Sequence, residues 1–357
     1  MRIGILTFHC AYNVGAMLQC YALQQYLMSL GHEVRVINYR PSYLETKRPS
    51  IRLRRLLLNP FNYGAYILQK LSFLRKRYNK FKEFENKYFI LSSVCKSKSD
   101  VENLVNNFDT IILGSDQIWC PKFNGNDILW YGELKKPKST RFVTYAASAG
   151  GAEFDVLELE QFKRYLSNFN AISVREKKLY DTLSPYADIY LTIDPTLLLD
   201  PSLYEKWYKP IRKDKYVLVR QARPDNNIYR IANIIARGLD AKVVTADAHR
   251  ESFKNCKNVM ACSPDEFVSL VKNAQCVVTN SFHGLAFAII TEVPFYTIKL
   301  DDGGDERLVN LLESLGLSDR MINKNEAPHF SPVDYSKIHD RLESLRTLSK
   351  QYLNNHL

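Results

Sequence analysis

A histidine stands where a short apolar stretch of the chain gives way to a helical pattern. Residues 276–279 are rich in β-branched types, the polar pair Asn280 and Ser281 interrupts them, and small apolar residues at helical spacing follow. In an open α/β sheet, ligands bind at the carboxyl ends of strands, and the N–H groups of a helix start attract anions. His283 could therefore hold a phosphate or carboxylate, or transfer a proton. The alternative is that Asn280 or Ser281 only caps the helix and that His283 packs beneath a loop.

The first forty residues contain a second junction of the same kind. They predict a buried strand over 2–8, a helix over 15–29 and a strand over 33–39, which is the unit that opens a parallel sheet. The loop between the first strand and the helix has neither the GxGxxG spacing nor a P-loop lysine. Dinucleotide and Walker-type sites are therefore disfavoured.

Six short motifs carry a resemblance to a known family. In chain order they are Asn13-x-Gly15-Ala16-x-Leu18-Gln19, Gly114-Ser115-Asp116-Gln117-Ile118-Trp119, Tyr145-Ala146-Ala147-Ser148, Ser173-Val174-Arg175-Glu176-Lys177, Asp194-Pro195-Thr196-Leu197-Leu198-Leu199 and Asn280-Ser281-Phe282-His283-Gly284. Each motif is weak alone, but together, in this order, they make nearly the whole chain similar to the polysaccharide pyruvyl transferase family. Several members carry Arg-Leu-His where this chain has Ser281, Phe282 and His283, so one cation of the family pattern is missing here.

The resemblance implies both a fold and a reaction. The fold is that of two-domain glycosyltransferases of the GT-B type. The reaction moves the enolpyruvyl group of phosphoenolpyruvate onto two sugar hydroxyls as a cyclic ketal and releases phosphate. The acceptor would be a sugar of a surface polysaccharide or of its lipid-linked oligosaccharide precursor.

Alternating strands and helices in both halves also favour two Rossmann-like, doubly wound α/β domains that face a cleft. A length of 357 residues exceeds what one core usually serves. We predict an acceptor-side domain at 1–205 and a donor-side domain at 206–357 that ends in a helical tail. Further strands are expected at 109–114, 141–147, 170–174, 188–193, 215–219, 241–246, 275–279 and 294–298. Helices are expected at 64–86, 99–106, 156–167, 175–183, 226–237, 264–273, 283–291, around 306–315 and after 334.

Composition narrows the class of protein. No apolar run approaches the ~18–20 residues that span a bilayer, and the N-terminus enters a strand without a secretory signal. The seven cysteines form no CxxC pair, which favours reduced thiols over disulfides or zinc. No spacing of His, Asp and Glu marks a metal site. We therefore expect a cytoplasmic enzyme without metal or cofactor, with phosphoenolpyruvate as its donor substrate.

The net charge of +11 is concentrated in one segment. Residues 47–87 carry twelve Lys or Arg against two Glu, interleaved with apolar and aromatic side chains. This pattern suits a basic helical insertion that lies on an anionic membrane surface, at the inner face of the membrane. No recognition motif supports nucleic acid as a partner. A solvated insertion packed on the first domain remains the alternative.

The candidate catalytic residues are His283 as general acid and Asp116 as base toward a sugar hydroxyl. Asp116 follows an apolar strand, and its alternative role is a turn cap. Arg175 is the candidate anion clamp, with a salt bridge to Glu176 as the alternative, and Arg307 could supply the missing cation. The other expected substrate-binding residues are Asn13, Gly15, Gln19, Ser115, Gln117, Ser148, Asn280, Ser281 and Gly284.

Two other functions stay open beside a pyruvyl transferase. One is a nucleotide-sugar-dependent glycosyltransferase in the same two-domain cleft, for which Asp301, Asp302 or Asp305 could bind a ribose. The other is a non-catalytic scaffold of polysaccharide assembly. The donors differ in their needs, because phosphoenolpyruvate requires two closely spaced anion sites and a nucleotide requires a flat base pocket.

Overall fold

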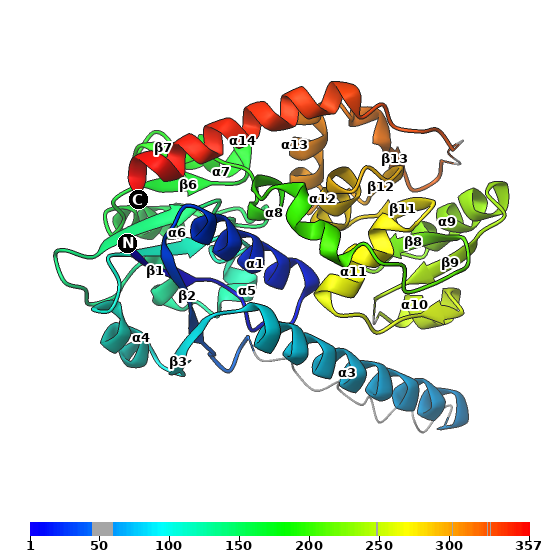
Figure 1. Cartoon of the computed structure of the whole chain (residues 1–357), viewed down its shortest axis with the longest axis horizontal. Helices are drawn as coiled ribbons and strands as arrows, with labels where there is room; N and C mark the ends of the chain where they lie inside the picture. The colour runs from blue at the N-terminus through cyan, green and yellow to red at the C-terminus, as the bar shows by residue number, and fades with distance from the viewer. Residues whose placement is uncertain (45–59, 248, 302, 327, 329) are drawn as a thin grey trace.

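A parallel sheet organises the first half of the chain. The computed structural model describes residues 1–44, 60–247, 249–301, 303–326, 328 and 330–357 (Figure 1). In the order β3-β2-β1-β4-β5, the sheet contains β1 (Arg2–Leu6), β2 (Glu33–Tyr39), β3 (Leu91–Cys95), β4 (Thr110–Gly114) and β5 (Arg141–Tyr145). The pair β6 (Ile172–Val174) and β7 (Ile189–Leu191) continues beside β5 through two isolated parallel bridges.

A second parallel sheet organises the other half. In the order β10-β9-β8-β11-β12-β13, it contains β8 (Tyr216–Arg220), β9 (Lys242–Thr245), β10 (Asn258–Val259), β11 (Cys276–Thr279), β12 (Phe295–Lys299) and β13 (Met321–Asn323). Strand order reverses beside the first strand of each half, β1 and β8, as in doubly wound folds.

Helices connect the strands and cover the sheets. Those of the first half are α1 (Val14–Ser29), α3 (Pro60–Tyr88), α4 (Lys98–Val105), α5 (Pro121–Asn124), α6 (Val156–Leu166), α7 (Lys177–Leu183) and α8 (Pro195–Leu198). Those of the second half are α9 (Asn227–Gly238), α10 (Arg250–Asn255), α11 (Pro264–Lys272), α12 (Phe282–Ile290), α13 (Glu306–Leu315) and α14 (Ser336–His356). Short 3₁₀ helices are η1 (Ile128–Tyr131), η2 (Pro201–Trp207) and η3 (Ser318–Arg320). The chain therefore has two Rossmann-like α/β domains.

Helix α1 lies between the two halves. It is buried nearly all round, and it contacts α8 as well as α11 and α12 of the second half. A helix that is apolar on every face must be covered on every face, which explains its place. The side chain of Asn13 caps α1 by accepting a hydrogen bond from the N–H of Gly15 at 2.9 Å. The start of α1 is thus presented to the second domain.

The predicted basic insertion is the long helix α3, which runs from the first domain along the second (Figure 1). Buried Glu85 pairs with Arg40 at 2.5 Å in the first domain, whereas Lys80 pairs with Glu266 of α11 at 2.6 Å. Residues 45–59, which include much of the predicted basic segment, lie outside the described residues. The described part of α3 therefore packs across both halves. In the described residues, no helix is both long enough and apolar enough to cross a bilayer.

Helix α14 crosses back from the second half to the first (Figure 1). It contacts α13 at one end, and near the other end the hydroxyl of Tyr352 donates to the carbonyl of Thr144 at 2.8 Å. The hydroxyl of Ser349 accepts from the N–H of Ile193 at 3.0 Å. The tail therefore joins the two domains on the side away from α3.

The structure adds elements that the sequence pattern did not predict. Strand β3 was missed because residues 91–95 are mostly half-buried or exposed at a sheet edge, so their side chains show no apolar period. The short strands β10 and β13 were missed for lack of length. The domain boundary near residue 205 stays a prediction, and that point lies within η2.

Candidate functional site

A buried carboxylate, Asp194, joins side chains from both domains. It caps α8 directly after β7. Its Oδ2 accepts a hydrogen bond from Nη1 of Arg175 at 2.5 Å and lies 3.6 Å from Nε2 of His283. The latter distance is too long for a hydrogen bond, so this contact is ionic when the imidazole is protonated. The hydroxyl of Ser115 donates to the same oxygen at 3.4 Å. We call these four residues the Asp194 centre.

The charges of the Asp194 centre keep its carboxylate ionised. Burial alone raises the pKa of Asp194, but the positive charges of His283 and Arg175 outweigh it, so this pKa lies below its ordinary value. A negative charge is therefore fixed in the interior, between a guanidinium of the first domain and an imidazole of the second.

His283 is held where two helices begin. It occupies the first turn of α12, just beyond the end of β11, and only 8% of its surface is exposed. The helix α1 starts against it, since a Cβ added to Gly15 would lie 2.0 Å from Nδ1 of His283. Both helix starts favour negative charge nearby. Gly15 thus permits the close approach of the two domains, a role that its place in the loop did not reveal.

Replacing Gly15 by alanine is expected to displace His283 and lower turnover about 100-fold, the effect of roughly 1 Å of misplacement of a catalytic group. Real Cβ atoms do not approach other atoms to 2.0 Å, so the ring or α1 must move. Turnover of the purified variant is the measurement. Gly238→Ala in α9 is the matched control, because a Cβ there meets no described atom within 4 Å. Wild-type turnover in Gly15→Ala would contradict the close approach.

Arg175 follows β6 at the carboxyl end of the strand, as predicted. Its guanidinium group contacts other side chains of the protein. Besides Asp194, its Nε lies 3.3 Å from Glu176 and its Nη2 donates to the hydroxyl of Ser148 at 3.0 Å. Its guanidinium lies 4.6 Å from the ring of Phe282. The alternative of a salt bridge to Glu176 is therefore present, and the role of anion clamp stays a prediction.

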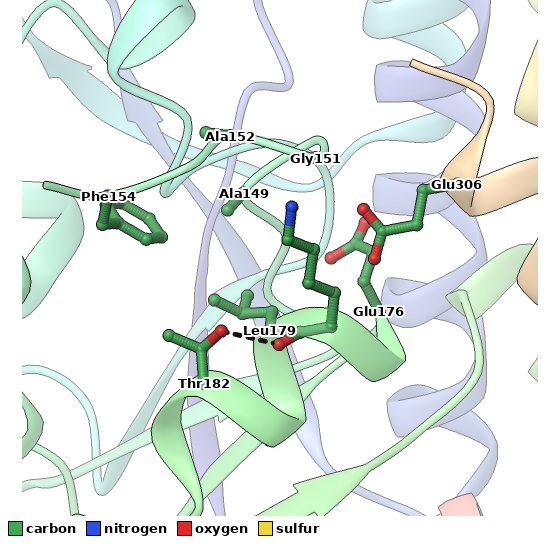
Figure 2. Close-up of a pocket in the computed structure, with 9 residues that line it drawn as sticks. Ala149, Gly151, Ala152, Phe154, Glu176, Leu179, Thr182 and Glu306 are labelled. Atoms are coloured by element: carbon green, nitrogen blue, oxygen red, sulfur yellow. Dashed lines mark hydrogen bonds between the residues drawn. The ribbon is translucent and has the colours of Figure 1, made fainter. Parts of the chain in front are cut away.

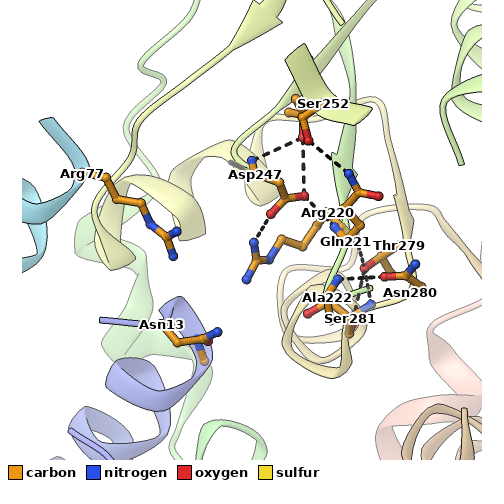
Figure 3. Close-up of polar contacts among 12 residues, drawn as sticks. Asn13, Arg77, Arg220, Gln221, Ala222, Asp247, Ser252, Thr279, Asn280 and Ser281 are labelled. Carbon is orange, nitrogen blue, oxygen red and sulfur yellow. Dashed lines mark hydrogen bonds and ion pairs between the residues drawn. The ribbon is translucent and has the colours of Figure 1, made fainter. Parts of the chain in front are cut away.

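Three other predicted residues make close contacts within the protein. Oδ1 of Asn280 accepts from the N–H of Ala222 at 2.8 Å, and its Nδ2 donates to the carbonyl of Arg223 at 2.8 Å (Figure 3). Gln19 is buried and donates to the hydroxyl of Thr7 at 2.9 Å. A Cβ on Gly284 would lie 2.3 Å from Oγ1 of Thr279. The amide of Asn280 therefore makes internal hydrogen bonds, whereas Oε1 of Gln19 is buried without a partner among the described residues. The expected substrate contacts of both residues stay predictions.

The remaining predicted residues lie at helix starts and loops of both domains. Ser281 is the N-cap residue of α12 and is buried. Asn13 is exposed at the start of α1. Asp116 is half-buried in the left-handed region at φ 68°, which Asp tolerates, and its Oδ1 accepts from the N–H of Gln117 at 2.8 Å. Its charge also acts on Arg175. Asp116 is therefore partly accessible beside the Asp194 centre.

A pocket lies where α13 meets the first domain (Figure 2). Glu176 and Glu306 face each other there, and each has a buried carboxylate oxygen with no hydrogen-bond partner among the described residues. Burial raises the pKa of Glu306, and the charge of Glu176 adds to the rise, against the opposing charge of Lys178. Nε of Arg307 is likewise buried without a described partner, and burial and the charge of Arg175 lower its pKa. The charges of Arg175, Glu176 and Asp116 thus act on Arg307, and its role as the missing cation stays a prediction.

Sequence reasoning missed several residues of this region. Asp194 belongs to one of the six motifs, but it was not among the expected site residues. Glu306 lies in an expected helix, where nothing distinguished it from its neighbours. Arg220 is the last residue of an apolar strand, so a search for polar side chains at strand ends could have found it. Nothing in the sequence distinguished Arg77 from the other cations of α3. Among the described residues, no three or more His, Cys, Asp or Glu side chains form a group that could hold a metal ion.

Comparisons with known proteins agree with this architecture. UDP-GlcNAc 2-epimerase from Methanocaldococcus jannaschii, solved with UDP-GlcNAc and UDP, has a TM-score of 0.50 at 15% identity, covering 97% of this chain and 93% of that chain. UDP-N-acetylglucosamine 2-epimerase from Rickettsia bellii has a TM-score of 0.50 at 11% identity, covering 99% and 95%. At such identities the likeness shows the fold alone, which is GT-B-like.

The sequence comparisons identify the family. A search of curated proteins finds no match. The model of the polysaccharide pyruvyl transferase family matches residues 13–302, which include all six motifs and every residue of the Asp194 centre. The chain therefore belongs to the polysaccharide pyruvyl transferase family.

Proposed function

We propose that the protein transfers the enolpyruvyl group of phosphoenolpyruvate onto two hydroxyls of a sugar, in a surface polysaccharide or its lipid-linked precursor. The single observation that carries the proposal is the meeting of His283 and Arg175 on buried Asp194, at the starts of α1 and α12. It places a proton carrier, a guanidinium and two helix N-termini in one small region. These are the groups that an anionic enol phosphate requires.

His283 is the proposed general acid. It donates a proton to the methylene carbon of phosphoenolpyruvate, and positive charge then develops at the carbon that bears the phosphate. Asp194 provides a fixed negative charge 3.6 Å from Nε2 of this imidazole. His283 is buried between the domains, so the donor must enter while they are apart.

Asp116 is the proposed base. It takes the proton of the first sugar hydroxyl as that oxygen attacks the cationic carbon, and phosphate leaves with its bonding electron pair. A second hydroxyl of the same sugar then attacks the carbon from which phosphate has left and passes its proton to the imidazole of His283, which closes the ketal and restores the general acid. Arg307 is the proposed replacement for the cation that the Ser281 motif lacks, because its Nε is buried without a described partner near Arg175.

The test is phosphate release from phosphoenolpyruvate with a panel of free and lipid-linked sugars. The proposal requires release that depends on the sugar, with a product heavier than the acceptor by one pyruvyl ketal. Release of a nucleotide from a nucleotide sugar, without use of phosphoenolpyruvate, would favour the glycosyltransferase alternative. No turnover of any donor would favour the scaffold.

The basic insertion is also proposed to hold the protein on an anionic membrane surface. Changing Arg54, Arg55 and Arg75 to glutamate is expected to weaken binding to anionic vesicles about 100-fold, since each cation near the surface contributes ~1 kcal/mol. Co-sedimentation in low and high salt is the measurement, because salt screens the attraction.

The control for this prediction changes three cations outside the insertion. Lys135, Lys138 and Lys337 are exposed, and their replacement by glutamate alters the net charge equally. Equal weakening in both variants would show that net charge, and not the insertion, governs vesicle binding. Vesicle binding that persists in the insertion variant would refute the membrane role.

A further inference from the structure

One cationic side chain of helix α3, that of Arg77, points inward, toward the second domain. Nη2 of Arg77 donates to the carbonyl of Tyr12 at 3.2 Å, just before the start of α1. The helix is fixed on both sides of Arg77, by the pair of Lys80 with Glu266 at 2.6 Å and by the rings of Phe73 and Phe253, whose centroids are 5.7 Å apart. Arg77 is therefore positioned by the fold, unlike a cation on a solvated helix face.

Arg77 faces a second arginine across the domain boundary. Arg220 ends β8, and only 7% of its surface is exposed. Nη1 of Arg220 pairs with Asp247, while its Nε is buried with no partner among the described residues. The other oxygen of Asp247 accepts from the N–H of Gln221 at 2.6 Å. Figure 3 shows the side chains of Arg77 and Arg220 pointing into one region above Asn13.

Charge in this region is not balanced by the described side chains around it. Burial lowers the pKa of Arg77, and the positive charge of Arg220 lowers it further, whereas Asp247 acts in the opposite direction. Among the described residues, Asp247 forms its ion pair with Arg220, and Arg77 has no carboxylate partner. Burying a cation without a full partner costs free energy, and an anionic ligand removes that cost.

We propose that a phosphoryl group binds between Arg77 and Arg220, beside the start of α1. Two guanidinium groups bind the oxygens of a phosphoryl group in a bidentate manner, and the N–H groups at a helix start add to this. The site takes one residue from each domain and is distinct from the Asp194 centre. It deepens the proposed function and rests on it only for the source of the ligand, which is either the phosphate of phosphoenolpyruvate or the diphosphate of a lipid-linked acceptor.

Titration calorimetry with inorganic phosphate, pyrophosphate and phosphoenolpyruvate tests the site. Arg77→Gln is expected to bind pyrophosphate at least ten-fold more weakly than the wild type. Arg75→Gln, two residues away on the exposed side of α3, is the matched control and is expected to bind as the wild type does. Because Arg220→Gln alone would leave Asp247 buried and unpaired, the second variant is the double change Arg220→Gln with Asp247→Asn, which should also lose binding.

Competition identifies the source of the phosphoryl group. If pyrophosphate displaces phosphoenolpyruvate, the site holds the donor, and if both bind together, it holds the acceptor. Phosphate and pyrophosphate binding by a folded Arg77→Gln protein as tight as that of Arg75→Gln would overturn the site, as would an absence of binding in the wild type. Failure of the proposed function would look different, with anion binding intact and no release of phosphate from phosphoenolpyruvate.

Discussion

Replacing His283 by alanine is expected to lower turnover about 10²- to 10⁴-fold, which is the usual contribution of a general acid. The fold should persist, because Asp194 keeps its 2.5 Å contact with Arg175 and alanine is the best helix former in the first turn of α12. Binding of phosphoenolpyruvate should weaken less than turnover does, since proton donation occurs in the transition state. The measurement is kcat and KM for phosphate release.

The control for this prediction is His339→Ala. The side chain of His339 is exposed and pairs with Glu292 at 2.8 Å, away from every residue assigned to the chemistry, so the variant should retain wild-type turnover. Unchanged kcat in His283→Ala would remove the histidine from the chemistry. Equal losses in binding and kcat would instead make it an anion ligand.

The change Asp194→Asn is expected to lower the free energy of unfolding by about 3–5 kcal/mol, the usual cost of breaking a buried ion pair from one side. The variant leaves Arg175 with only Glu176 as a carboxylate partner and removes the negative charge beside His283. Turnover should fall as well, because this charge faces the proposed general acid. Urea unfolding at neutral pH measures the loss.

An exposed ion pair of the same length provides the control. Lys177 and Asp181 are 2.5 Å apart, but their side chains are 57% and 56% exposed, so Asp181→Asn should change stability by less than about 1 kcal/mol. The pKa of Asp194 is lowered in the folded state, so its stabilisation is present above the ordinary pKa of an aspartate and is lost as the pH falls through the lowered value. Equal effects of the two variants at neutral pH would contradict the role of burial.

The parts of the site that could be predicted from sequence are those that follow strands. His283 and Arg175 each come directly after a buried strand, and the structure brings both to Asp194, as the prediction of a shared site requires. The rule works because parallel strands place their carboxyl ends at one edge of each sheet, and residues that follow β6 and β11 meet at Asp194. The two-domain fold was equally accessible, since alternating strands and helices recur in both halves.

The parts that could not be predicted depend on how the two domains meet. The close approach of Gly15 to His283 joins residues far apart in sequence, and no local pattern reports it. Arg77 points inward only because α3 is docked on α11. The internal hydrogen bonds of Asn280 were hidden for a different reason, since its partners follow the neighbouring strand β8 of the same sheet and are distant in sequence. Tertiary contacts decide where these residues lie, and local secondary-structure propensities do not reveal such contacts.

The contact that helix α14 makes with the first domain affects how the chain folds during its synthesis. The hydroxyl of Tyr352 closes on Thr144, a partner 208 positions earlier in the chain. At synthesis rates of about 5–20 residues per second, the growing polypeptide takes roughly 10–40 s to travel from one to the other. Throughout that interval the patch of the first sheet that Tyr352 covers, including the ring of Tyr145, lacks its native cover. The first domain begun is thus among the last to be completed, and its nascent form depends on protection from aggregation for that time.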